Sequence, residues 1–175
     1  MTALQGVVSR VVSPLDTAVV SATKIHGGTA YNVIPEEVTI SGNVRAYRNE
    51  VMDAIENAIT RIAAGTAALF DARAAVDFRR VYPPLVNHAH EAIIAADAAA
   101  EVVGEENVER DGPPRTASED FAFMLEARPG AYVFLGGGGD RACDVHHPEY
   151  DFNDETIPAG CSWWAEIVER RMAIA

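Results

Sequence analysis

The sequence lacks the features of a membrane or secreted protein. No window of its 175 residues approaches 18 consecutive apolar residues, so we expect no membrane-spanning helix. The first residues show no basic segment followed by an apolar one, which argues against a signal peptide. The two cysteines, Cys143 and Cys161, are too few for a disulfide framework. These absences predict a cytoplasmic protein with no membrane partner.

Basic residues are also scarce. Fourteen lysines and arginines stand against 26 aspartates and glutamates, which gives a formal net charge of −12. An acidic surface repels phosphate backbones, so we expect no nucleic-acid partner. Apolar residues make up 49% of the chain and charged residues 23%. This composition is typical of a globular chain rather than a disordered one.

The first half of the chain shows alternating helix and strand patterns. Apolar residues recur at helical spacing over 1–13 and 50–70. Segments 18–25 and 38–45 are β-branched or alternate with a period of two, and 74–78 also alternates, so each predicts a strand. This order is that of a ferredoxin-like domain without its first strand. The first helix also has no N-cap residue, so we expect the chain to begin inside a longer one.

The pair Pro83-Pro84 marks the best internal boundary. We therefore expect two domains, over 1–82 and 83–175. The second is expected to alternate helix and strand, as a piece of an α/β layer domain does. Thr116 and Glu119 have the spacing of a capping box that opens a helix. The predicted elements of this part are helices over 90–103, 117–127 and from about 157, and a buried strand over 131–135.

One candidate functional segment begins with a histidine at the end of a predicted strand. His26 precedes two glycines, which let the backbone turn sharply or approach a ligand closely. Asn32 offers both a hydrogen-bond donor and an acceptor. Arg45, on the polar face of the next predicted strand, could bind a carboxylate with two hydrogen bonds. On spacing alone, a plain hairpin loop with a surface histidine is the simpler interpretation.

A second segment, 144–149, contains two adjacent histidines after a glycine-rich turn. Imidazole is a common metal ligand, but a metal site needs about three or four ligands. Adjacent residues on an extended segment point opposite ways, so one of His146 and His147 is expected to coordinate. A loop histidine satisfied by hydrogen bonds is an equal alternative. His88 and His90 open a predicted helix, where side chains two positions apart diverge, and a solvated helix N-terminus explains them better.

Five blocks of the sequence occur together and in this order in one family. They resemble the hippurate hydrolase-like metallo-aminoacylases, which are N-acyl amino acid amidohydrolases grouped with carboxypeptidase G2 and succinyl-diaminopimelate desuccinylase. The resemblance covers nearly the whole chain, and only Thr116-Ala117, before the third block, departs mildly from it. The blocks are IHGGTAYNVIPEEV from Ile25, GNVRAY from Gly42, SEDFAFML from Ser118, RPGAYVFLGGG from Arg128 and HHPEYDFND from His146.

The resemblance implies an α/β catalytic domain with an inserted ferredoxin-like lid that forms a homodimer. It implies hydrolysis of N-acyl amino acids or small peptide-like substrates with two divalent metal ions, of the zinc, manganese, nickel or cobalt kind. His146 corresponds to a metal ligand. Asn32 and Arg45 correspond to substrate-binding lid positions, and His26 to a catalytic residue that serves a neighbouring subunit's site.

The same resemblance implies that most of the metal ligands, and the carboxylate that acts as general base, lie in an N-terminal half outside this chain. We therefore expect the chain to hold the catalytic metals weakly or not at all, and to be inactive alone. Two alternatives remain. One is a non-catalytic module that keeps the lid for dimerisation or interaction, and the other is a small protein that binds a metal through His88, His90 and His146.

Overall fold

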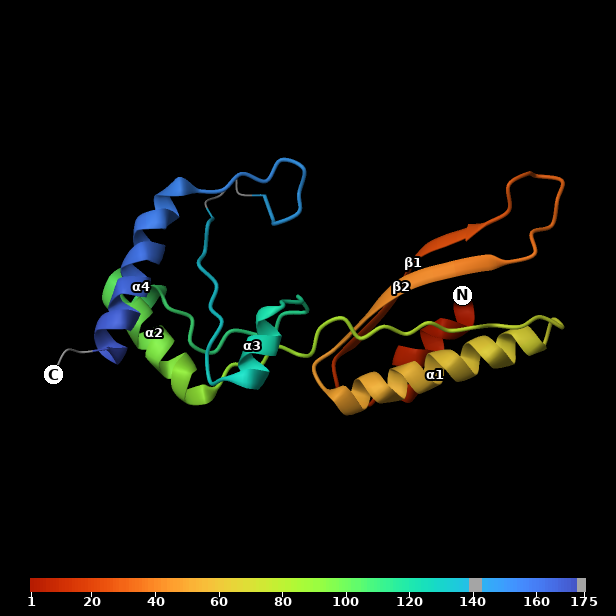
Figure 1. The fold of residues 1–175 in the computed structure, drawn as a ribbon, viewed down its shortest axis with the longest axis horizontal. Coiled ribbons are helices and arrows are strands. Elements are labelled where there is room, and N and C mark those ends of the chain that lie inside the picture. The colour runs from red at the N-terminus through yellow and green to blue at the C-terminus, as the bar shows by residue number, and fades with distance from the viewer. Residues whose placement is uncertain (139–142, 173–175) are drawn as a thin grey trace. The chain divides into compact units, whose positions relative to one another are not determined.

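The computed structural model describes residues 1–138 and 143–172, and the chain divides into two compact units (Figure 1). Unit 1 comprises Met1–Leu85 and Thr116–Glu119, and unit 2 comprises Val86–Arg115 and Asp120–Ala175. The chain thus passes from unit 1 to unit 2 just after the Pro83-Pro84 pair. None of the described helices is long and apolar enough to cross a membrane.

The sheet of unit 1 is an antiparallel hairpin of β1 (Ala18–Gly27) and β2 (Val38–Ala46). These strands confirm the prediction from the β-branched and alternating segments. The pairing register shifts between Ala22 and Lys24, which leaves Thr23 as the extra residue of a β-bulge. Gly42 lies beside this irregularity, and a Cβ atom at this position would overlap the carbonyl oxygen of Ser21. The two strands can therefore approach this closely only because residue 42 is a glycine.

Helix α1 (Asn49–Ala68) packs its apolar stripe against one face of the hairpin and confirms the predicted helix. Ile55 and Val7 are fully buried at the centre of this core. Segment 1–13 is not the single α-helix that its spacing predicted. It forms a 3-10 helix, Thr2–Leu4, and a π-helix, Val7–Val11. The wider π turn still directs Val7 into the core, so the apolar spacing identified the buried residue but not the type of helix.

The predicted third strand over 74–78 does not form in the described structure. This segment runs back along α1 instead of joining the hairpin (Figure 1). Arg80 holds it there with ion pairs of 2.6 Å to Asp53 and 2.5 Å to Glu56, both on α1. An extended segment becomes a strand only when a neighbouring strand pairs with its backbone groups. Unit 1 therefore shows the helix–strand–strand–helix part of the predicted order without the strand that follows.

Unit 2 contains three α-helices in its described residues: α2 (Ala89–Val103), α3 (Phe121–Ala127) and α4 (Ile157–Arg171). Helices α2 and α4 lie side by side (Figure 1). The indole of Trp163 on α4 donates a hydrogen bond of 2.9 Å to the carbonyl of Ala95 on α2. Small residues such as Ala98, which is fully buried, let α2 pack closely. Two 3-10 helices, Glu105–Asn107 and Asp154–Thr156, complete the regular structure of this unit.

Two predictions for the part of the chain after Pro84 were wrong. Helix α3 begins at Phe121 with Asp120 as its N-cap and no side-chain capping bond, so Thr116 and Glu119 do not form a capping box. Segment 131–135 is not a strand, because among the described residues no neighbouring strand pairs with it. A side chain takes the neighbour's place: Asn87 binds both backbone groups of Tyr132 at 2.8 Å.

Candidate functional site

His26 lies on β1 opposite Thr39 of β2, one residue before the strand ends, and its side chain is exposed. Gly28 follows with a φ of +77°, a left-handed conformation that favours glycine. Asn32 lies in the exposed loop that connects the strands, next to a turn in which the N–H of Val33 donates to the carbonyl of Ala30 at 3.4 Å. The structure thus presents His26 and Asn32 to solvent at one end of the hairpin.

Arg45 lies at the other end of the hairpin, opposite Val19, and is half-buried. Its guanidinium donates a hydrogen bond to the backbone carbonyl of Thr116, which also belongs to unit 1. A guanidinium carries five N–H donors, so one bond to a carbonyl leaves donors for a carboxylate. This contact fixes the position of Arg45 without using up its capacity to bind a ligand.

His26 and Arg45 share one face of the hairpin but lie far apart on it. Thr39, the partner of His26, and Arg45 are six positions apart on β2, so their side chains point to the same side. This is the face opposite the one that packs on α1, where Val44 contacts the core. At about 3.4 Å per residue, the separation is about 20 Å. Within one chain, a ligand the size of an amino acid cannot contact both side chains.

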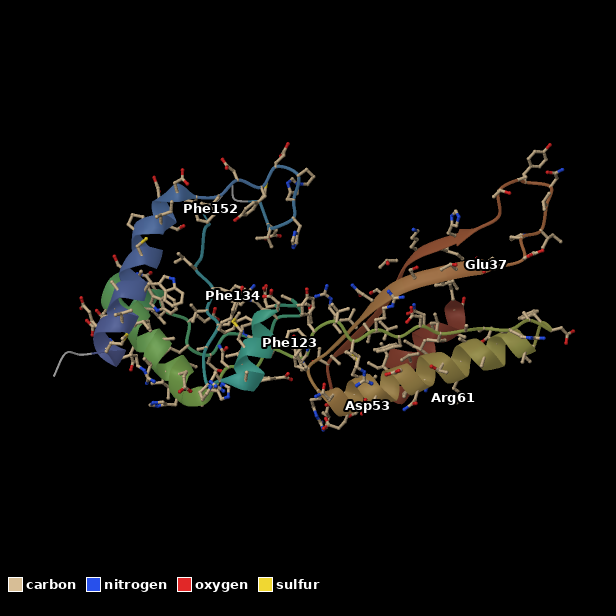
Figure 2. All side chains as sticks on the ribbon, in the orientation of Figure 1. Glu37, Asp53, Arg61, Phe123, Phe134 and Phe152 are labelled. Carbon is tan, nitrogen blue, oxygen red and sulfur yellow. The ribbon has the colours of Figure 1, made fainter. Side chains whose placement is uncertain are left out.

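His146 lies on an exposed turn of unit 2 and has a φ of +73°. The turn belongs to a loop closed by two backbone hydrogen bonds. The N–H of His147 donates to the carbonyl of Asp144 at 3.0 Å, and the N–H of Tyr150 donates to the carbonyl of His147 at 3.0 Å. The loop ends just before Phe152, which Figure 2 labels. The glycine run before the loop extends to Gly139, which lies outside the described residues.

Among the residues that the structure describes, the donor groups around His146 do not make a shell for two metal ions. His146 supplies one imidazole, whereas a metal site needs about three or four ligands. The group of potential ligands that does gather in the described chain comprises Cys143, His147 and Glu149, whose ligand atoms lie within 4.8 Å of one another. Sequence analysis missed this group, although the close spacing of Cys143, His147 and Glu149 within seven residues gives a signal in the sequence.

His88 and His90 do not join His146 in a metal site among the described residues. The Nδ1 atom of His88 accepts a hydrogen bond of 3.3 Å from the backbone N–H of Gly130, and the backbone N–H of His88 donates to the carbonyl of Gly130 at 3.1 Å. His88 therefore ties the start of α2 to the segment after α3. His90 is exposed on α2. The structure gives no support to a metal protein built on these three histidines.

Comparison with known proteins gives a consistent result. Hippurate hydrolase of Campylobacter jejuni is 36% identical over 165 residues, which are 94% of this chain and 43% of that protein. N-acetyl-L-cysteine deacetylase of Bacillus subtilis is 36% identical over 159 residues, which are 89% of this chain and 36% of that protein. The chain thus spans less than half the length of these curated relatives.

A solved structure shares the fold. It is that of the YXEP protein of Bacillus subtilis, described as a dinuclear metal-binding peptidase from the M20 family. The likeness has a TM-score of 0.75 at 30% sequence identity and covers 99% of this chain and 46% of that one. The sequence model of peptidase family M20/M25/M40 matches residues 4–170. This chain therefore belongs to peptidase family M20/M25/M40.

Proposed function

We propose that this chain acts as the C-terminal part of a metal-dependent amidohydrolase that cleaves the amide bond of N-acyl amino acids. The observation that carries the proposal is the match to the family over 4–170, together with exposed positions for His26, Asn32 and His146. The relatives named as a hippurate hydrolase and an N-acetyl-L-cysteine deacetylase support this substrate class. We propose a cytoplasmic location for the same protein.

Each candidate residue has a role that suits its chemistry. Bound divalent metals supply Lewis acidity and an activated water in such a reaction. The imidazole of His146 would contribute one nitrogen to hold them. His26 would donate a hydrogen bond to the oxyanion that develops at the scissile carbonyl. Asn32 would bind the substrate through its amide, and Arg45 would bind the carboxylate of the amino acid product with a pair of hydrogen bonds.

The separation of about 20 Å between His26 and Arg45 supports a two-subunit arrangement. If each active site uses one of these residues from its own chain and the other from a partner, both can contact one small substrate. We therefore propose that the hairpin takes part in a homodimer. An exposed apolar pair supports this: Ile25 and Ile40 lie on the same face as Val44, are paired across the strands, and remain 60% and 44% exposed. Exposed apolar patches of this kind mark interaction sites.

A non-catalytic interaction module is the second candidate function. The exposed apolar residues of the hairpin favour it, since such a surface can bind a partner whether or not the chain takes part in catalysis. The two functions differ in one respect: only the hydrolase requires His26 and His146 for its activity.

The test is an assay of two proteins with N-benzoylglycine and N-acetylcysteine as substrates. One protein is this 175-residue chain, and the other is the product of its gene expressed from the genomic start. We expect the gene product to hydrolyse at least one substrate when supplied with zinc or manganese, and to lose activity in chelator. We expect the 175-residue chain to show no hydrolysis under either condition.

Two outcomes would contradict the proposal. Hydrolysis by the 175-residue chain with the same kcat as the gene product would show that its own residues suffice. An inactive gene product that binds metal and still dimerises would favour the interaction module. Replacement of His146 by alanine in the gene product is the matched control, because it should abolish activity and leave the hairpin unchanged.

A further inference from the structure

The loop 143–150 brings together three side chains of different chemistry. The Sγ atom of Cys143, an imidazole nitrogen of His147 and a carboxylate oxygen of Glu149 all lie within 4.8 Å of one another. Cys143 is half-buried, whereas His147 and Glu149 are exposed. From this geometry we propose that the three residues form a zinc-type divalent metal site of their own, distinct from the catalytic metals assigned to His146.

The donor set fits zinc better than magnesium or calcium. A thiolate and an imidazole are ligands that zinc prefers, whereas magnesium and calcium are bound almost entirely by oxygen atoms. Three protein ligands leave the fourth tetrahedral position to water. Zinc binds sulfur at about 2.3 Å and nitrogen or oxygen at about 2.0–2.2 Å, so ligand atoms around one ion lie about 3.5 Å apart. The three side chains therefore need to close by about one ångström, which surface side chains can do by changing rotamer.

The backbone of the loop is already closed by hydrogen bonds. One hydrogen bond runs from the backbone N–H of His147 to the carbonyl of Asp144, and the other from the N–H of Tyr150 to the carbonyl of His147. Both bonds involve His147 itself, and their other ends are residues adjacent to Cys143 and Glu149. The side chain of His147 is fixed as well, because its Nδ1 atom accepts a hydrogen bond of 3.1 Å from the N–H of Glu149. A site on this loop therefore needs little ordering of the backbone when the metal binds.

Metal binding would break the hydrogen bond from the Glu149 N–H to the Nδ1 atom of His147. A metal ion at Nδ1 would take the lone pair that accepts from the Glu149 N–H. A metal ion at Nε2 would require the ring proton to lie on Nδ1, which would then no longer accept. Either way this hydrogen bond breaks on binding, and the Cys143 thiol releases its proton to solvent as the thiolate–metal bond forms. The site therefore exchanges one internal hydrogen bond for three metal–ligand bonds.

His146 is the neighbour that must be distinguished from this site. It is adjacent to His147 in sequence, but the group of ligand atoms within 4.8 Å contains His147 and not His146. His146 has a left-handed backbone with a φ of +73°, a conformation that bulky residues rarely adopt. The proposed site does not depend on hydrolase activity, because all three ligands lie within one loop of this chain.

The test uses the 175-residue chain after dialysis against chelator, titrated with cobalt(II) as a spectroscopic probe for zinc. Coordination by Cys143 gives a thiolate-to-cobalt charge-transfer absorption in the near ultraviolet. We expect one equivalent of cobalt to bind, zinc to displace it, and the amide hydrogen of Glu149 to exchange faster in the metal-bound protein. Cys143→Ser should abolish the absorption, and His147→Ala or Glu149→Gln should weaken binding at least tenfold.

Two variants serve as matched controls. Cys161→Ser removes the other free cysteine, on α4, and should leave the absorption unchanged. His146→Ala removes the adjacent imidazole and should also leave cobalt affinity unchanged. The proposal is overturned if wild-type protein shows no charge-transfer absorption, or if His146→Ala abolishes binding while His147→Ala does not. Circular dichroism of each variant checks that the helices are intact.

Discussion

The side-chain amide of Asn87 binds the backbone of Tyr132 through both of its ends. Its nitrogen donates to the carbonyl of Tyr132 at 2.8 Å, and its oxygen accepts from the N–H of Tyr132 at 2.8 Å. One side chain thus does for this extended segment what a neighbouring strand would do. The next residue continues the pairing, since His88 and Gly130 form two further hydrogen bonds with each other.

We predict that Asn87→Ala destabilises the protein by about 1–3 kcal/mol, because it removes the partners of two half-buried backbone groups. Asn87→Asp keeps one acceptor but places a carboxylate oxygen against the Tyr132 carbonyl oxygen, so at neutral pH it should also destabilise the protein. Urea unfolding followed by circular dichroism measures both. Asn107→Ala is the control, since it removes one exposed hydrogen bond to Val103. If Asn87→Ala and Asn107→Ala lose the same free energy of unfolding, then the pairing with Tyr132 stabilises the protein no more than an exposed hydrogen bond does.

Replacement by alanine should change the stability of the protein in opposite directions at two glycines. Gly42→Ala should destabilise the hairpin strongly, because the new Cβ atom would overlap the Ser21 carbonyl. Gly65 lies within α1 and has no heavy atom within 4 Å of the Cβ position. Gly65→Ala should therefore stabilise the protein by about 0.5–1 kcal/mol, since alanine favours a helix. Thermal unfolding of both variants provides the comparison, and a stable Gly42→Ala variant would refute the close approach.

Self-association is predicted to depend on the apolar face of the hairpin. We expect the chain to sediment as a dimer that dissociates on dilution, and Ile40→Lys to sediment as a monomer, because it places charges in an apolar interface. Val81→Lys is the control, since Val81 is 63% exposed and lies outside the hairpin. A wild-type chain that is monomeric at all concentrations would contradict the proposed interface, and a broad distribution of large species would indicate aggregation instead.

His26 and Arg45 are predicted to affect different kinetic constants in the product of the complete gene. His26→Ala should lower kcat by about 10²–10³, because it removes a donor to the developing oxyanion. Arg45→Ala should mainly raise KM, since a bound carboxylate is present in both substrate and transition state. Asn43→Ala, on the same face between them, should change neither. A His26→Ala enzyme with wild-type kcat would rule out the catalytic role.

Acid should weaken the ion pair between Glu105 and Arg110. Hydrogen bonds of 2.6 and 2.7 Å from the Arg110 guanidinium lower the pKa of the Glu105 carboxyl below its ordinary value. The stability that this pair contributes is present above the unfolded-state pKa and is lost as pH falls through the lower folded-state pKa. An NMR titration should show the pKa of Glu105 rising toward its ordinary value in Arg110→Gln. An unchanged pKa would show that Arg110 is not its cause.

Local patterns predicted most of unit 1 but not the pairing of extended segments. The stripe of α1 was readable because one face of the helix is buried, and burial imposes a period on the sequence. The alternation of β2 was readable because successive side chains of a strand point to opposite faces, although only the end of β2 near Val44 and Ala46 packs on the core. Segments 74–78 and 131–135 carry similar patterns, yet one is held by Arg80 and the other by Asn87. A sequence pattern gives the preference of a segment for an extended backbone, whereas the identity of its hydrogen-bonding neighbour depends on the rest of the fold.

The candidate site was predictable only where a residue's role depends on nearby sequence. The position of His26 before Gly27 and Gly28 followed from the residues themselves. The separation of His26 from Arg45 required the strand register, and the gathering of Cys143 and His147 required the turns of their loop. Neither distance can be read from spacing alone, because each depends on how the backbone folds between the two residues.

Unit 1 is discontinuous in sequence, and the hydrogen bond from Arg45 to the Thr116 carbonyl joins its two segments. Its segment Thr116–Glu119 is flanked on both sides by residues of unit 2. A single cleavage after Pro84 would therefore release an N-terminal piece in which Arg45 has lost this acceptor. The two units cannot be separated at one peptide bond and each remain whole, because the chain crosses between them three times, after Leu85, Arg115 and Glu119.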